Sequence, residues 1–424
     1  METGGTGGDP GLMNGKNAGL SGANRHMNRD QTTHPRLQAL RDAGVSIWLD
    51  TLSRELLETG AFAALVADYS VTGVTSNPTI FAKAIKGSDR YDHQIRRLVS
   101  SGTRDSQELF FALALDDVRR AADVLRPSYD ASDGQDGFVS FECTPDLADD
   151  THGTIAQALE LWRRLARPNV LIKVPGTEAG IPAIEELTAR GVNVNVTLLF
   201  SLARYEQVIE AYIAGVERRL KAGEQVDGIA SVASFFVSRV DAKADAQLPA
   251  GSDLRGRIAI ANARSAYWRY RKRFTDERWL ILHDAGAKPQ RPLWASTGTK
   301  DPAYSDVLYV DELVLPFAIN TMPEATLRAF ADHGQPGGSF DWSPGAAEAT
   351  LGRAAAAGVD LDSITAELER AGVESFCQSY EELLRRIETK LAATVLRLSD
   401  SRAADRWSNE GGPVSQEAGP RSRA

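Results

Sequence analysis

A lysine stands inside an otherwise apolar run of this 424-residue sequence. Lys173 is flanked by Ile172 and Val174, and burial in such a strand disfavours the charged ammonium form. A neutral lysine amine carries a free lone pair, which imine formation with a ketone requires. Taken alone, the residue fits equally well as a structural ion-pair partner of Glu142 or Asp50. A pyridoxal phosphate anchor is less favoured, because no obvious glycine-rich phosphate cradle stands next to the lysine.

Two carboxylates end other apolar runs and can exchange protons with a substrate. Asp50 closes the run SIWLD, and Glu142 closes GFVSFE. Amine addition, carbinolamine dehydration and carbon–carbon cleavage each move a proton, so a Schiff-base enzyme needs at least one acid–base group. Together with the hydroxyl of Thr197, these carboxylates complete a candidate catalytic set around Lys173.

More polar residues fall in or directly after apolar runs, namely Thr75, Asn77, Asn195, Ser234 and Ser296. In a barrel of parallel strands, polar side chains at the carboxyl ends point into the active-site mouth. With the catalytic candidates, these residues come from seven different predicted strands. We therefore expect one site at one end of a barrel. Asn77 precedes Pro78 and on its own is better explained as a turn residue.

Fixed positive charge and hydrogen-bond donors for a phosphate are also available. Arg239 follows the run SFFVS, and the turn Ser296–Lys300 (STGTK) offers a hydroxyl, glycine-permitted backbone N–H groups and a lysine. Asp149, Asp150 and His152 suggest a metal site, but this spacing is more typical of a helix N-terminus before a helical run. No metal or organic cofactor is predicted.

The elements that position these residues alternate between β-rich runs and helical patterns, which is typical of βαβ units on a parallel sheet. The predicted strands are SIWLD, GVTSN, GFVSFE, VLIKV, VNVNVT, IASVASFFV, PLWAS and VLPFAIN. The pattern predicts an α/β fold, a (β/α)₈ TIM barrel with extra helices and a helical C-terminal extension.

Helical spacing supports segments 155–165 and 182–190 and the run behind Ser201, a predicted N-cap. The stretches from Asn77 to Glu142 and from Ser234 to Ser296 are long enough for additional helices. Segment 350–394 is predicted wholly helical, and either caps the barrel or forms a homodimer contact.

Composition limits the class of protein. The net charge of −9 argues against nucleic acid as the main partner. The basic stretch 264–273, with interleaved aromatics, is therefore expected to pack on the barrel. Cys143 and Cys377 lack the spacing of a zinc site or disulfide framework, which fits a reducing cytoplasm. Neither a signal peptide nor a membrane span is predicted. We expect one barrel domain over 34–399 between disordered segments 1–33 and 400–424.

Several segments, in order along the chain, resemble the transaldolase family in its longer bacterial and plant-type branch. They are GVTSNPTIFAKAI, LIKVPGTEAGIPAIEEL, GVNVNVTLLFSLARYEQVIEAYIAGVE, ASFFVSRVD and RPLWASTGTKDPAYSDVLYVDELVLPFAINTMPEAT. The resemblance runs from about Val45 to about Gly334. It implies a barrel of class I aldolase type that needs no cofactor. It also implies transfer of a dihydroxyacetone unit from sedoheptulose 7-phosphate or fructose 6-phosphate to glyceraldehyde 3-phosphate or erythrose 4-phosphate, in the non-oxidative pentose phosphate pathway.

The resemblance also implies roles for individual residues. Lys173 forms the imine, Asp50 takes the proton from the hydroxyl next to the cleaved bond, and Glu142 works with Thr197 through a bound water. A larger set of residues is implied to contact the substrate. Thr75, Asn77, Asn195 and Ser234 would hold the dihydroxyacetone moiety, Phe236 would line the site, and Arg239 and Ser296 would bind the phosphate. The sequence departs from shorter members after Ser296, where Thr297 and Gly298 replace a phenylalanine and a phosphate-binding arginine. Lys300 is the candidate replacement for that arginine. Which of Lys300 and Arg239 supplies more of the phosphate affinity is left open by the sequence.

Two other functions are compatible with parts of this pattern. A Schiff-base aldolase that releases free dihydroxyacetone needs nearly the same residues, although such chains are usually much shorter. A catalytically silent sugar-phosphate sensor or scaffold would use the basic aromatic helix and the C-terminal helices as a partner surface. The intact set Lys173, Asp50, Glu142 and Thr197 argues against a silent protein.

Overall fold

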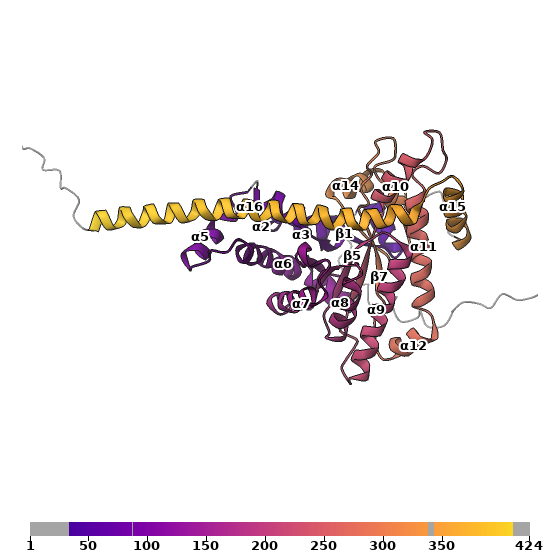
Figure 1. Cartoon of the computed structure of the whole chain (residues 1–424), viewed down its shortest axis with the longest axis horizontal. Helices are drawn as coiled ribbons and strands as arrows, with labels where there is room; N and C mark the ends of the chain where they lie inside the picture. The colour runs from indigo at the N-terminus through magenta and orange to yellow at the C-terminus, as the bar shows by residue number, and fades with distance from the viewer. Residues whose placement is uncertain (1–33, 87, 338–342, 410–424) are drawn as a thin grey trace, which may run out of the picture.

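The computed structural model describes residues 34–86, 88–337 and 343–409 (Figure 1). Parallel strands β1 to β8 form a closed barrel in chain order, and β8 pairs with β1. Helices α6 to α9 and α11 pack around the strands (Figure 1). The (β/α)₈ TIM barrel expected from the sequence is therefore confirmed. Across the described residues, no helix combines the length and apolar character that crossing a bilayer needs.

The strands lie within or next to the predicted runs. They are β1 (Ser46–Leu49), β2 (Val71–Thr75), β3 (Val139–Glu142), β4 (Val170–Pro175), β5 (Val194–Leu199), β6 (Ser231–Phe236), β7 (Arg291–Ala295) and β8 (Ile319–Met322). The prediction was wrong at the last strand, which begins after Pro316 and Phe317 and continues beyond Asn320. Phe317 adopts a left-handed φ of 65°, and a proline has no N–H to donate to the sheet, so a turn occupies this place.

The helices include the predicted ones and additional helices in both long connections. Their bounds are α1 (Pro35–Asp42), α2 (Arg54–Glu58), α3 (Ala61–Asp68), α4 (Pro78–Lys86), α5 (Asp92–Ser100), α6 (Ser106–Ala131), η1 (Pro145–Leu147), α7 (Thr151–Leu165), α8 (Gly180–Ala189) and α9 (Leu202–Lys221). They continue with α10 (Ser238–Ala244), η2 (Asp245–Gln247), α11 (Ile258–Arg273), α12 (Glu277–Asp284), α13 (Leu308–Glu312), α14 (Glu324–His333), α15 (Pro344–Ala356) and α16 (Leu361–Asn409). Ser201 caps α9 as predicted, its hydroxyl accepting from the N–H of Arg204 at 3.1 Å.

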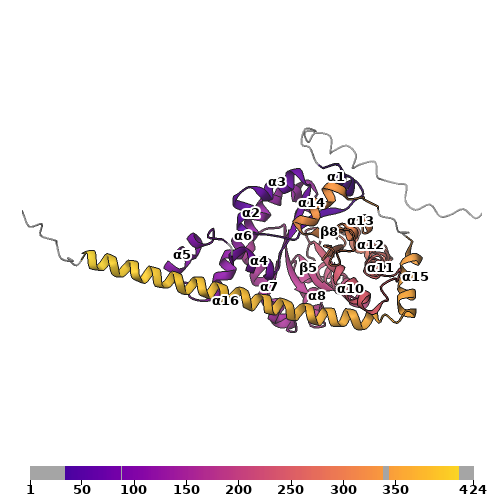
Figure 2. The same cartoon turned by 90° about the horizontal axis from the view of Figure 1, so that it is seen from above.

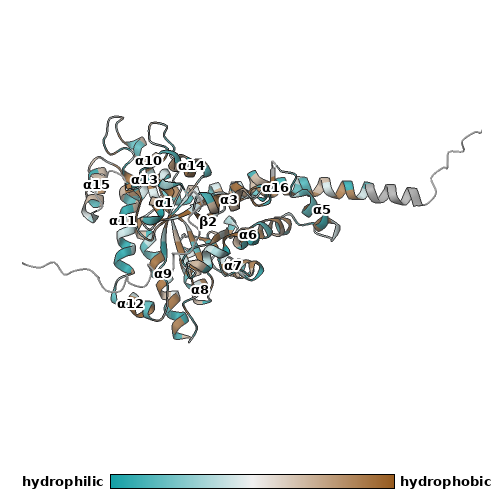
Figure 3. Cartoon of the chain, turned by 180° about the vertical axis from the view of Figure 1, so that it is seen from behind, coloured by the Kyte–Doolittle hydropathy of each residue, from teal (hydrophilic) through white to brown (hydrophobic). Residues whose placement is uncertain are grey.

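The hydrophobic core lies in and around the strands, which Figure 3 shows mostly in the hydrophobic colour. Trp48 of β1 is fully buried against Gly73 of β2. A Cβ on Gly73 would approach the indole to 2.4 Å, so only glycine leaves room for this ring. The indole Nε1 donates to Asp136 at 2.8 Å, which satisfies the one polar atom of the tryptophan side chain.

Helix α11 contains the basic stretch 264–273, and its charges are used within the protein. Tyr267 and Tyr270 are buried against the barrel, as predicted. Three of its arginines pair with acidic side chains: Arg264 with Glu312, Arg269 with Glu206, and Arg273 with Glu210. Ion pairs within the protein therefore use most of the positive charges of this basic stretch.

The prediction that 350–394 is wholly helical was wrong, because residues 357–360 separate α15 from α16 and Gly358 there has a left-handed φ of 89°. Helix α16 crosses the barrel and projects past α5 (Figures 1 and 2). Residues 400–409, assigned to a disordered tail by the sequence, belong to this helix. Extending an existing helix costs little compared with nucleating one, which a composition-based boundary does not capture. Segments 1–33 and 410–424 lie outside the described residues.

Candidate active site

A cavity of about 150 Å³ opens at the carboxyl ends of the barrel strands. Its walls are formed by Asp50, Thr75, Asn77, Lys173, Thr197, Ser234, Phe236, Arg239, Ala295, Ser296, Gly298, Lys300, Thr321, Pro323 and Phe376. Every site residue predicted from the sequence lines this cavity except Glu142 and Asn195. The expected convergence of polar strand ends on one mouth is thus present in the structure.

Lys173 lies in the middle of β4 and faces the end of β3. Strand register places it beside Glu142, and the Nζ–Oε1 distance is 3.6 Å with side chains only 7% and 8% exposed. The Nζ also donates to the backbone oxygen of Ser76 at 3.0 Å. Burial raises the pKa of Glu142, and Asp50 raises it further, although the Lys173 charge opposes both effects. The carboxyl next to the amine therefore holds a proton more readily than an exposed carboxyl would.

Asp50 directly follows β1 and faces the same space. Its Oδ1 accepts from the Thr75 hydroxyl at 3.1 Å, and that hydroxyl lies 2.9 Å from the hydroxyl of Thr321 on β8. Burial raises the pKa of the Asp50 carboxyl, while Lys173 and Arg239 oppose the rise. The environment therefore moves this group toward the range in which a carboxylate is a useful general base.

Two buried oxygens in this region have no hydrogen-bond partner among the described residues: Glu142 Oε2 and Thr197 Oγ1. Thr197 lies within a bulge, where the register of β5 against β6 shifts between Val196 and Leu199. Leu198 takes the extra position with a φ of 61°, a conformation that costs a non-glycine residue about 1 kcal/mol or more. Strain next to a free buried hydroxyl is typical of a functional position.

Asn195 lies behind the cavity wall rather than in it. It is fully buried, its amide donates to the Ser140 hydroxyl at 2.9 Å, and its carbonyl accepts from Ser234 at 2.7 Å. Ser234 lines the cavity, so this chain of bonds fixes the orientation of the hydroxyl that a substrate meets. Direct contact between Asn195 and substrate stays a prediction.

The positive side chains lie at the other wall, after β6 and β7. Arg239 is half-buried, with its guanidinium 5.4 Å from the ring centre of Phe236, while Lys300 is exposed. Ser296 has a φ of 56°, and its hydroxyl lies 3.0 Å from that of Ser238. Burial lowers the pKa of Arg239 from its ordinary value, yet a guanidinium stays charged in proteins. This wall offers an anion one enclosed and one exposed cation.

Helix α10 carries Arg239 and is anchored by a buried carboxyl two residues later. Asp241 accepts from the backbone N–H of Ala259 at 2.7 Å and from the Tyr309 hydroxyl at 3.0 Å. Burial raises the pKa of Asp241 to about 7, so forming the charge here has a cost. These bonds join α10 to α11 and α13 and thereby fix the position of the guanidinium.

Comparison with known proteins identifies the family of this barrel. The sequence model of the family Transaldolase/Fructose-6-phosphate aldolase matches residues 47–387. The chain belongs to this family. A transaldolase of Saccharopolyspora erythraea is 52% identical over 364 residues, covering 85% of the chain and 99% of the relative. A transaldolase of Frankia alni is 52% identical over 365 residues, and Transaldolase 1 of Streptomyces avermitilis 50% over 361, covering 97% and 95% of those relatives and 84% of the chain in each case. At this similarity over nearly whole relatives, the chain is an enzyme, a transferase.

The transaldolase/fructose-6-phosphate aldolase family match ends inside α16, so the family region includes residues that sequence reasoning did not place at the site. Thr321 was missed because the last strand was predicted to end near Asn320. Phe376 was missed because its spacing on a helix indicates only a packed face, with no signal for what that face covers. Asp150 caps α7 by accepting from the N–H of Gly153 at 3.0 Å, which confirms the helix N-terminus predicted there.

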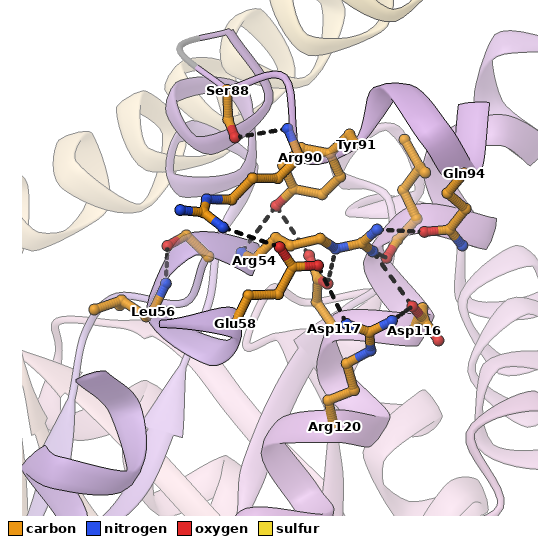
Figure 4. A network of polar contacts seen from close by, with 12 residues as sticks. Arg54, Leu56, Glu58, Ser88, Arg90, Tyr91, Gln94, Asp116, Asp117 and Arg120 are labelled. Atoms are coloured by element: carbon orange, nitrogen blue, oxygen red, sulfur yellow. Dashed lines mark hydrogen bonds and ion pairs between the residues drawn. The ribbon is translucent and has the colours of Figure 1, made fainter. Parts of the chain in front are cut away.

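The segment after Asp50 is held by a buried polar network, drawn in Figure 4. Arg54 begins α2 and is 2% exposed, and its Nε donates at 2.7 Å to Asp117 of α6, which is fully buried. The Tyr91 hydroxyl donates to the same carboxylate at 2.9 Å. The Cζ of Arg54 lies over the Tyr91 ring, 4.5 Å from the centre of that ring. These contacts connect the first active-site loop of this family member to α5 and α6.

Arg54→Ala is expected to lower the free energy of unfolding by about 3–5 kcal/mol, because it leaves the buried Asp117 carboxylate without its cationic partner and with only the Tyr91 hydroxyl bond. Urea unfolding at neutral pH measures the change. Arg120→Ala is the matched control, since Arg120 is 46% exposed and pairs with Asp116 at the surface. We expect the control to change stability by less than about 1 kcal/mol. Equal losses in both variants would contradict a role for the buried pair.

Proposed function

We propose that this chain transfers a dihydroxyacetone unit from a ketose phosphate to an aldose phosphate through an imine on Lys173. The donors would be sedoheptulose 7-phosphate or fructose 6-phosphate, and the acceptors glyceraldehyde 3-phosphate or erythrose 4-phosphate, as in the non-oxidative pentose phosphate pathway. One observation carries the proposal: a buried lysine amine between two carboxyl groups of raised pKa, in a chain of this family. The cytoplasmic location predicted from the sequence stays a prediction.

The amine of Lys173 would attack the ketone carbonyl of the donor. Glu142 lies 3.6 Å away and can take the ammonium proton, because burial raises the pKa of its carboxyl and makes it a better proton acceptor than an exposed carboxylate. The carbinolamine must then lose water. The free oxygens of Glu142 and Thr197 support a role in holding that water and delivering its proton.

Asp50 would act at the next step, removing the proton from the hydroxyl beside the carbon–carbon bond that breaks. The bond electrons move toward the iminium nitrogen, which leaves a neutral enamine on Lys173 and frees an aldose phosphate. Thr75 donates to Asp50 and holds the carboxylate in orientation. Ser234, fixed by Asn195, and Asn77 both line the cavity, which supports a role for them in hydrogen-bonding the hydroxyls of the retained unit.

Arg239, Ser296 and Lys300 would bind the phosphate of donor and acceptor. Arg239 is the more enclosed cation, and enclosure strengthens a charge-assisted hydrogen bond. Gly298 lines the cavity without a side chain, so this wall differs from one that carries a second arginine at that place. We infer that Arg239 supplies the larger share of the phosphate affinity.

A second function is release of free dihydroxyacetone, because the matching family model also names fructose-6-phosphate aldolase. Transfer is favoured because relatives named transaldolase match this chain over 95% to 99% of their own length. Products separate the two functions. With fructose 6-phosphate and erythrose 4-phosphate, transfer forms sedoheptulose 7-phosphate, whereas an aldolase forms dihydroxyacetone whether or not an acceptor is present.

Borohydride trapping tests the mechanism. Incubation with fructose 6-phosphate, reduction and peptide mass spectrometry should find one adduct, on Lys173, because reduction converts the imine to a stable secondary amine. Lys83, exposed on α4, serves as an internal control and should stay unmodified. No adduct, or an adduct on Lys83 or Lys300, would contradict the proposed chemistry and favour the silent sugar-phosphate sensor.

A further inference from the structure

The C-terminal helix α16 is fixed across the barrel mouth by contacts at many places. The buried hydrophobic residues of its inward face are Ile364, Leu368, Phe376, Tyr380, Leu383, Ile387 and Leu391. Polar contacts flank the mouth: Glu367 with Lys243 of α10, Glu369 with Arg204 of α9, Ser379 with Thr79 of α4, and Tyr380 with Gln107 of α6. Since these partners belong to different barrel units, the helix is held as a fixed cover.

One residue of this cover reaches the reacting amine. Phe376 is 6% exposed and lines the cavity, and the centre of its ring lies 6.0 Å from Lys173 Nζ. No other α16 residue lines that cavity among the described residues. The ring thus forms an apolar wall on the side of the lysine where the helix closes the barrel.

The helix approaches closely at a glycine one turn before this phenylalanine. A Cβ on Gly372 would lie 2.9 Å from Leu198 Cδ2, so glycine allows the helix to sit directly on the β5 bulge. Leu198 is the strained residue of that bulge and follows Thr197. The helix therefore contacts the bulge one turn away from Phe376.

We propose that Phe376 determines the partition between transfer and release, by keeping bulk water away from the enamine on Lys173. This inference rests on the proposed function.

In transfer, the enamine carbon, two bonds from Nζ, bonds to the acceptor aldehyde carbon, whose oxygen takes a proton. In release, that carbon takes a proton from solvent instead. A water oxygen then bonds to the iminium carbon, the carbon–nitrogen bond breaks, and the amine and dihydroxyacetone leave with one proton returned to solvent. An apolar wall slows the first proton transfer and leaves acceptor addition unaffected.

The test compares Phe376→Ala, Phe376→Leu and wild type with fructose 6-phosphate and saturating erythrose 4-phosphate. The measured quantity is the ratio of free dihydroxyacetone to sedoheptulose 7-phosphate. Phe376→Ala is expected to raise this ratio by at least about tenfold, and Phe376→Leu by about threefold, because the smaller apolar side chain closes the wall incompletely. If the alanine variant does not fold, the leucine variant alone decides.

Leu368→Ala is the matched control, since Leu368 is on the same helix face, equally buried at 6%, and does not line the cavity. It removes a similar amount of α16 packing and should leave the ratio within about twofold of wild type. A wild-type ratio in the Phe376 variants, or an equal rise in Leu368→Ala, would overturn the inference while wild-type transfer and the Lys173 adduct stand. A wild type that forms no transfer product would instead overturn the proposed function and this inference with it.

Discussion

Lys173→Ala is expected to lower kcat by about 10⁴-fold or more, because it removes the buried amine that forms the covalent intermediate in the proposed mechanism. The variant is expected to remain folded, so the lower rate reflects lost chemistry. The measurement is single-turnover conversion of fructose 6-phosphate with erythrose 4-phosphate, together with trapping by borohydride. Lys83→Ala removes an exposed lysine from α4 and should keep wild-type turnover, which controls for a general loss of positive charge.

The stability of the same variant separates a nucleophile from a structural ion pair. Removing one partner of a buried pair costs about 3–5 kcal/mol when the remaining charge stays buried. Here the remaining partner is Glu142, whose pKa burial raises, so it can take a proton once the Lys173 charge is gone. We therefore expect Lys173→Ala to lose no more than about 2 kcal/mol, chiefly from lost side-chain packing.

Two further variants test this account of stability. Lys173→Met keeps the length of the side chain without its amine, and should be as inactive as the alanine variant but more stable. Adding Glu142→Gln to Lys173→Ala should change the free energy of unfolding little, since the carboxyl is then already neutral. Unfolding of Lys173→Ala at neutral pH, with recovery of the fold in the double variant, would show that the pair has a structural role.

Much of this architecture could be predicted from local sequence, because a barrel strand is apolar on both faces and its functional residues lie at one end. Lys173 between Ile172 and Val174 could be assigned to a buried strand without knowledge of any neighbour. The convergence of Asp50 and Thr197 on it then follows from the closed topology alone, since all parallel strands end on the same side.

The parts that could not be predicted depend on contacts between distant segments. Phe376 is separated from Lys173 by several barrel units, and its helical spacing is the same whether its face covers a core or a cavity. Asn195 has the same strand alternation as a wall residue, yet its hydrogen bonds with Ser140 and Ser234 place it behind the wall. The late start of β8 depends on the turn conformation of Phe317, which residue type does not encode.

Asp50→Asn is expected to lower kcat by about 10²- to 10⁴-fold, because the carboxylate is the base that opens the carbon–carbon bond. The amide can still accept from Thr75, so the geometry of the site is preserved while the base is lost. Imine formation on Lys173 does not need this base. Borohydride trapping with fructose 6-phosphate should therefore recover the intact six-carbon donor on Lys173 in the variant, whereas wild type accumulates the three-carbon unit.

The pH dependence of kcat and of stability is an independent test of Asp50 as the base. Burial raises the pKa of Asp50 above its ordinary value, so wild-type kcat should fall as pH decreases through that raised pKa and the base gains a proton. The variant should lack this limb of the profile.

A carboxyl of raised pKa stabilises the fold at low pH, and this contribution disappears as pH rises and the group ionises in the folded state. Asp50→Asn should consequently be at least as stable as wild type at neutral pH, while being far less active. A variant that is less stable, retains the acid limb and yields only the three-carbon adduct would assign the base to another group, with Glu142 the nearest carboxyl to the imine nitrogen.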